Sequence, residues 1–124
     1  MYCTILSFGY HYGTPEADIT IDCRILRNPA RIADLFHKTG LHRDVQRHVL
    51  DMPKARQLLV RALRLYHDTI GNGQSHITLA FGCSKGKHRS VALAQEFCEF
   101  MQREFPDDTF VVEHTERDKW PKQT

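Results

Sequence analysis

The sequence predicts an α/β fold: a single compact domain over residues 1–124, with a mixed or mostly parallel sheet flanked by helices. Three observations lead to this prediction. The length suits one domain, and the 41% hydrophobic and 26% charged shares are typical of a folded globular chain. Strand patterns alternate with helical patterns, which indicates layered α/β architecture. One strand also runs through a basic, glycine-containing loop directly into a helix.

The first quarter of the chain predicts two strands. Residues 4–8 form a short apolar run that ends at Gly9, as a buried strand does. The glycines and proline of 10–15 indicate a loop. Residues 19–25 alternate apolar and polar side chains, which is typical of a half-buried strand, and Asn28-Pro29 ends it.

Two helices are predicted next. Apolar residues at helical spacing indicate a short helix near 41–50. Asp51 is then expected to be the N-cap of a second helix with Pro53 in its first turn. The apolar stripe of that helix continues over 55–70, and Gly71-Asn72-Gly73 stops it.

The last part of the chain predicts a strand, a loop, a helix and a strand. Residues 76–81 read as a strand that leads into Gly82. Apolar residues then recur at helical spacing over 91–105, and Pro106 closes this helix. Residues 109–114 are expected to form the final strand.

The loop between the third strand and the last helix has the composition of an anion-binding site. A loop that opens a helix directs free backbone N–H groups at one point, where the helix dipole adds positive potential. Gly86 permits the positive φ that a tightly curved loop needs. Arginine can hold two phosphate oxygens at once, and histidine can donate a hydrogen bond or move a proton. The predicted anion-binding residues are Ser84, Lys85, Gly86, Lys87, His88, Arg89 and Ser90.

The same loop leaves an enzymatic alternative open. Cys83 and Arg89 stand in a C-x5-R-S arrangement, which is similar to the phosphate loop of cysteine-dependent phosphatases. Positive charge around the loop would favour a nucleophilic thiolate. Such an enzyme also needs a general acid, for which the candidates are Asp22, Asp107 and Asp118. A binding protein without catalytic residues is favoured, and the absence of a Walker A pattern argues against hydrolysis of nucleoside triphosphates by this chain.

Charge is distributed unevenly along the chain. Residues 24–64 contain ten Lys or Arg and three acids, whereas 104–118 contain six acids and one arginine. The basic middle favours an anionic partner such as a phosphate, a nucleotide or RNA, although a solvated helix face is an alternative. Salt-dependent RNA contacts are predicted at Arg27, Arg31, Arg43 and Arg47.

Other features limit the function class. The four cysteines and eight histidines show no metal-binding spacing, so no metal and no cofactor are expected. No apolar run approaches the ~20 residues of a membrane span, and the N-terminus does not resemble a signal peptide. The chain is therefore expected in the cytoplasm, with reduced thiols and no membrane partner.

Four motifs, in order, resemble a known family. They are Ser7-Phe8-Gly9-Tyr10-His11-Tyr12-Gly13, Asp22-Cys23-Arg24-Ile25-Leu26-Arg27-Asn28-Pro29, Thr39-Gly40 and Gly82-Cys83-Ser84-Lys85-Gly86-Lys87-His88-Arg89-Ser90. This order resembles the C-terminal domain of RapZ, the RNase adaptor protein. The resemblance implies a regulatory binding module for a phosphorylated amino sugar or a similar sugar-phosphate or nucleotide-sugar anion. It also implies binding of small RNA and assembly into dimers.

The resemblance also assigns site residues. It places the loop residues around the anion, with Arg24 and Asn28 as neighbours. His114 falls where the family keeps a histidine, so it is expected to be a further pocket neighbour. Its nucleotide-binding N-terminal domain has no counterpart here, so the expected partner is a second copy of the chain or a separate nucleotide-binding protein. His11, Ala30 and Lys85 depart from the family pattern, as does the mixed charge of 112–119. These departures leave sugar identity and RNA binding by the tail open.

Overall fold

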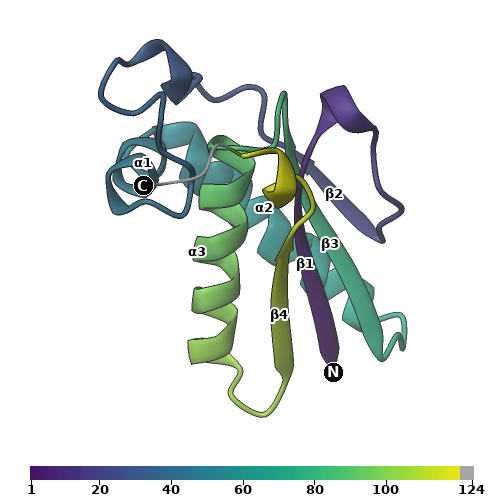
Figure 1. Cartoon of the computed structure of the whole chain (residues 1–124). Helices are drawn as coiled ribbons and strands as arrows, with labels where there is room; N and C mark the ends of the chain where they lie inside the picture. The colour runs from purple at the N-terminus through teal and green to yellow at the C-terminus, as the bar shows by residue number, and fades with distance from the viewer. Residues whose placement is uncertain (121–124) are drawn as a thin grey trace.

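The computed structural model describes residues 1–120, which fold around one four-stranded sheet (Figure 1). The strands lie in the order β2-β3-β1-β4, and every neighbouring pair is parallel. The predicted α/β domain with a mostly parallel sheet is therefore confirmed. The elements are β1 (Tyr2–Gly9), β2 (Ile19–Asp22), α1 (Arg43–Leu50), α2 (Pro53–Ile70), β3 (His76–Cys83), α3 (Arg89–Glu104) and β4 (Thr109–His114), with short 3-10 helices at Tyr10–Tyr12, Pro29–Arg31 and Arg117–Lys119.

The three α-helices and one face of the sheet enclose the main hydrophobic core. Alternate residues of the strands, such as Ile5, Ile21 and Leu79, point to this face and are fully or almost fully buried. Leu93 and Phe97 of α3 pack against them from the helical layer. This arrangement follows from strand geometry, because successive side chains point to opposite faces of the sheet. The core thus holds the strands and α3 in a fixed relation.

The opposite face of the sheet carries a much smaller apolar cluster. Leu6, Phe8 and Ala80 form it, and Tyr10 and Ala17 from the loop after β1 cover it. The sheet therefore has helices on one side and a loop with a short 3-10 helix on the other (Figure 1). Because this loop covers the cluster, Phe8 is fully buried near the carboxyl end of β1.

Two predicted boundaries were wrong. The second strand was expected over 19–25, but β2 ends at Asp22, because the Asp22 carboxylate accepts the backbone N–H of Arg24 at 2.9 Å and turns the chain. Asp51 was expected to cap the second helix. Instead it ends α1, with its N–H donating to the carbonyl of Arg47, and Met52 precedes Pro53 at the start of α2 without a side-chain cap.

The carboxyl ends of all four strands lie at one edge of the sheet (Figure 1). The segments that leave this edge are 10–18, 23–42, 84–88 and 115–120. In open parallel sheets, ligands bind in the crevice outside the carboxyl ends of the strands. The loop predicted from sequence to bind an anion lies at this edge.

Candidate functional site

The basic loop packs against the end of β1 through two glycines. Gly86 has φ of +70°, so its conformation is one that other residues rarely adopt. A Cβ atom added to Gly86 would lie 2.6 Å from the backbone nitrogen of Gly9. A Cβ atom added to Gly9 would in turn lie 2.7 Å from the carbonyl oxygen of Lys85. The curvature of the loop thus depends on glycine at both positions.

Four consecutive amide groups of the loop have no acceptor in the described part of the protein. Within residues 1–120, the backbone N–H groups of 85–88 donate to no acceptor of the protein. The loop leads into α3, whose first-turn N–H groups add to the positive potential at the same end. Free N–H groups at the start of a helix are the donors that oxyanions use.

A cavity of about 130 Å³ lies at this loop, and we call it the loop cavity. Its volume is about four times the ~30 Å³ that one molecule of liquid water occupies, so it suits a small oxyanion better than a whole metabolite. The walls come from two segments that are distant in sequence, 28–36 and 83–89. The lining residues are Asn28, Ala30, Phe36, Cys83, Lys85, Lys87, His88 and Arg89.

Two lining residues have buried nitrogen atoms without a partner. His88 is 6% exposed and Arg89 is 5% exposed. Within residues 1–120, His88 Nε2 and Arg89 Nε make no hydrogen bond. A buried polar atom left unpaired costs about 1–3 kcal/mol. Neither atom reaches the surface of the cavity, so an acceptor held there would have to draw the side chain toward it to form a hydrogen bond.

Arg89 connects the loop to the turn that follows β2. Its Nη1 donates to the carbonyl of Leu26 at 3.0 Å and to that of Arg24 at 3.3 Å, and its Nη2 donates to Ser84 Oγ at 3.3 Å. The sequence analysis expected this guanidinium to hold two phosphate oxygens. Of the five N–H groups of this guanidinium, three are engaged within residues 1–120. The N–H of Nε and the second N–H of Nη2 are left for a two-point contact with phosphate, which stays a prediction.

The electrostatics of the loop combine one neutral and two cationic side chains. Burial, followed by the positive charge of Lys87, lowers the pKa of His88 from 6.5 to about 4, so this imidazole is neutral at pH 7. Burial also lowers the pKa of Lys87, whose ammonium donates to the carbonyl of Phe36 at 2.8 Å. Lys85 is exposed at the rim. An anion in the cavity would therefore meet positive charge that the protein does not neutralise within 1–120.

Cys83 and Ser90 form a hydrogen-bonded pair behind the loop. Cys83 is 2% exposed, and its thiol donates to Ser90 Oγ at 3.1 Å. The Ser90 hydroxyl donates in turn to the carbonyl of Phe8 at 3.3 Å. Ser90 is not among the residues that line the loop cavity. This pair ties the end of β3 and the start of α3 to β1.

The geometry does not support the cysteine-phosphatase alternative. Cys83 is almost fully buried, and its Sγ is hydrogen-bonded to Ser90 Oγ, so it is not open to a substrate. Asp22 is bound to Arg24, and this contact lowers the pKa of its carboxyl group, so it is a poor proton donor at neutral pH. Asp107 lies at the amino-terminal end of β4, the opposite edge of the sheet, and Asp118 does not line the loop cavity.

A second, larger cavity of about 520 Å³ adjoins the first, and we call it the arginine cavity. It shares Asn28 and Arg89 with the loop cavity. The remaining lining residues are Arg24, Ile25, Leu26, Arg27, Arg31, Ile32 and His48. The two cavities together bring the predicted neighbours Arg24 and Asn28 to the basic loop.

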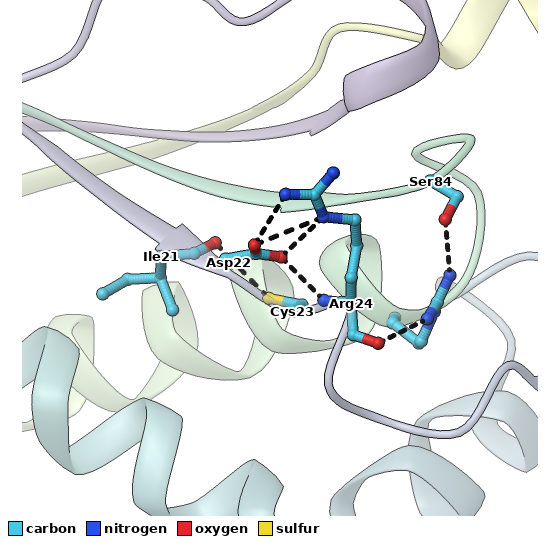
Figure 2. A network of polar contacts seen from close by, with 6 residues as sticks. Ile21, Asp22, Cys23, Arg24 and Ser84 are labelled. Carbon is cyan, nitrogen blue, oxygen red and sulfur yellow. Dashed lines mark hydrogen bonds and ion pairs between the residues drawn. The ribbon is translucent and has the colours of Figure 1, made fainter.

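Arg24 is already paired. Its Nη2 lies 2.8 Å from Asp22 Oδ2 and its Nε donates to Asp22 Oδ1 at 3.0 Å (Figure 2). The guanidinium also lies over the ring of Tyr10, 3.8 Å from its centroid. Because Asp22 balances its charge, Arg24 forms part of the wall of the arginine cavity but adds little net positive charge to it.

The other predicted site residues lie apart from the loop cavity. His114 Nδ1 is 2.6 Å from Ser7 Oγ, and its Nε2 is 3.2 Å from Gln95 Oε1, so both ring nitrogens have partners. Arg43 and Arg47 are exposed on α1 and line neither cavity. Of the four arginines predicted to contact RNA, only Arg27 and Arg31 reach the arginine cavity.

Sequence reasoning missed a strap formed by residues 115–120. The buried carboxylate of Glu116 accepts the backbone N–H of Gly9 at 3.0 Å and pairs with Lys119 at 3.0 Å. Trp120 Nε1 donates to the carbonyl of Gly86 at 3.0 Å. No local pattern marks these residues, because their partners lie in β1 and in the loop.

Comparison with known proteins assigns the family. The family model described as the RapZ C-terminal domain matches residues 1–118. The chain belongs to the RapZ C-terminal domain family. It is similar to a nucleotide-binding protein of Saccharopolyspora erythraea, with 42% identity over 93% of this chain and 40% of the relative. A nucleotide-binding protein of Geobacter sulfurreducens is 39% identical over 91% of this chain and 40% of the relative.

The RapZ C-terminal domain described here thus spans about 40% of the length of these relatives. Within the part of the chain that the structure describes, no helix has the length and apolar character needed to cross a membrane. Among the same residues, no three His, Cys, Asp or Glu side chains are grouped so as to hold a metal ion. Its four cysteines are buried and unpaired.

Proposed function

We propose that this RapZ C-terminal domain is a binding module for a phosphorylated small molecule, with the phosphate group in the loop cavity. One observation carries the proposal: the buried His88 Nε2 and Arg89 Nε lack partners within 1–120 and belong to residues that line the same cavity as Lys85 and Lys87. A phosphate oxygen would satisfy each donor while the lysines balance its charge. We propose a regulatory role for such a module, since the one thiol that lines the loop cavity within residues 1–120 is almost fully buried and hydrogen-bonded to Ser90.

The free backbone amides of 85–88 support the same proposal. They face the end of the molecule where the dipole of α3 is positive, which is the arrangement that protein phosphate sites use.

Thermal denaturation with added anions tests the proposal. Phosphate, sulfate and a sugar phosphate should each raise the Tm in proportion to the logarithm of concentration above Kd, while chloride at matched ionic strength should not. The variant Lys87→Gln should reduce the shift, and Lys54→Gln, an exposed residue of α2 outside the cavity, is the matched control. An unchanged Tm with every oxyanion would rule the proposal out.

RNA binding is the second candidate function. It is supported by exposed arginines that make no ion pair within 1–120, namely Arg27, Arg31, Arg43 and Arg47. Contacts to RNA phosphates release counterions, so the affinity should fall steeply as salt rises. Replacing Arg43 and Arg47 by Gln should weaken binding and flatten the salt dependence. No binding of single-stranded RNA at low salt would exclude this function.

Self-association and pairing with a separate nucleotide-binding protein remain predictions. An apolar groove of about 380 Å³ between α2 and α3, lined in part by Val60, Leu63 and Phe100, gives a surface for such contacts. Sedimentation velocity over a range of concentrations measures the dimer directly. A sedimentation coefficient that stays at the monomer value up to the highest concentration would contradict dimer formation.

A further inference from the structure

The arginine cavity continues the loop cavity away from α3. Asn28 and Arg89 belong to both, so a ligand seated at the loop would extend past these two residues. At about 520 Å³, the arginine cavity alone falls in the range of small-molecule pockets, about 300–1,000 Å³. The loop cavity, at about 130 Å³, has room for little more than the first anionic group. The arginine cavity is the adjoining space into which the rest of a ligand would extend.

The charge lining the arginine cavity is unbalanced. Arg24 is paired with Asp22, but Arg27 and Arg31 have no acidic partner within residues 1–120. No Asp or Glu lines this cavity. Arg89 brings a further cation whose Nε is free and buried. A neutral sugar hydroxyl would leave this positive charge uncompensated, whereas a second anionic group would meet it with charge-assisted hydrogen bonds.

The arginine cavity also has apolar lining. Ile25, Leu26 and Ile32 line the arginine cavity beside its cations. Leu26 also carries the carbonyl that holds Arg89 Nη1 at 3.0 Å, so this part of the lining is fixed to the loop. This geometry suits a short carbon skeleton with a charged group at each end.

We propose that the ligand carries two anionic groups: a phosphate in the loop cavity and a second group, phosphate or carboxylate, held by Arg27 and Arg31 in the arginine cavity. The position of the phosphate rests on the proposed function, whereas the position of the second anionic group does not. It assigns these two arginines to a small-molecule site, and it separates them from Arg43 and Arg47, which line neither cavity.

Calorimetric titration tests the proposal with five probes: inorganic phosphate, glucose 6-phosphate, fructose 1,6-bisphosphate, 2,3-bisphosphoglycerate and 3-phosphoglycerate. All are compared at one ionic strength, because surface charge alone would favour the more highly charged probes. At least one two-anion probe should bind ten or more times tighter than glucose 6-phosphate. The double variant R27Q/R31Q should remove this advantage and leave the affinity for inorganic phosphate within about twofold.

The double variant R43Q/R47Q is the matched control, since it removes the same charge from exposed positions on α1. It should leave the preference for two anions unchanged. Equal affinity of the one-anion and two-anion probes would overturn the inference while the phosphate site stands. An equal loss in both double variants would also overturn it, because the preference would then come from the general field of the surface. If inorganic phosphate and all other probes fail to bind, the proposed function itself is wrong.

Discussion

The indole N–H of Trp120 donates to the carbonyl oxygen of Gly86 at 3.0 Å, although the two residues are 34 positions apart. Beside this bond, Glu116 accepts the backbone N–H of Gly9 at 3.0 Å. The segment after β4 therefore holds the basic loop and the end of β1 at the same time. Because the loop carries the free amides, its shape depends on a part of the chain that contributes no residue to either cavity.

Replacing Trp120 by Phe keeps the aromatic ring and removes the donor to Gly86. One hydrogen bond contributes about 0.5–1.5 kcal/mol, so phosphate affinity should fall about twofold to tenfold as the loop loosens. The amides of His11 and Gly40 donate to the loop carbonyls of Ser84 and Lys87, and their hydrogen exchange should become faster by a similar factor. Tyr2→Phe is the control, because Tyr2 is an exposed aromatic residue at the start of β1, on the opposite edge of the sheet. Unchanged exchange in W120F would show that the strap does not support the loop.

Replacing Gly86 by Ala should destabilise the fold. The residue has φ of +70°, and the added Cβ would lie 2.6 Å from the nitrogen of Gly9. We expect a loss of about 1–3 kcal/mol in the free energy of unfolding, measured by urea denaturation. Gly73 is the matched control: its φ is +86°, but an added Cβ meets nothing within 4 Å. A loss in G73A as large as that in G86A would mean that the contact with β1 contributes nothing.

Lys87 is the cation that we expect to contribute most to phosphate binding. Its side chain is partly buried, and burial lowers the pKa of its ammonium group because the charged form loses water. A bound anion would stabilise that charged form in place of the lost water. A hydrogen bond to a charged group contributes about 1.5–3 kcal/mol, so Lys87→Gln should weaken phosphate binding about tenfold or more. Calorimetry measures this loss, and K54Q should leave the Kd within twofold. An unchanged Kd in K87Q would place the phosphate elsewhere.

Acidification should destabilise the fold in two stages. Burial lowers the pKa values of His88 and His114 from 6.5 to about 4, so the unfolded chain binds protons at these residues before the folded one does. The stability they contribute is complete above pH 6.5 and is lost as the pH falls toward 4. Carboxyl groups with lowered pKa, such as those of Asp22 and Glu116, also stabilise the fold, and this contribution is lost at still lower pH. Urea denaturation from pH 7.5 to 4.5 measures the first stage, and H88Q should make the slope shallower. Equal stability at pH 7 and pH 5 would contradict the prediction.

The periodicity of the sequence was sufficient to predict the strands and α-helices, because buried faces repeat every two or every 3.6 residues. It was also sufficient to place the basic loop at the carboxyl edge of the sheet. It could not predict that Arg89 donates hydrogen bonds to Leu26, Arg24 and Ser84, since these acceptors come together only in the folded chain. The end of β2 was misplaced for a related reason: apolar alternation continues to Ile25, but the hydrogen bond from the Arg24 N–H to Asp22 turns the backbone.

A crystal structure grown with inorganic phosphate tests the central claim most directly. We predict one phosphate in the loop cavity, with oxygens within hydrogen-bonding distance of His88 Nε2, Arg89 Nε and the amides of 85–88. A phosphate seated at another surface, with these atoms still lacking an acceptor, would contradict the account.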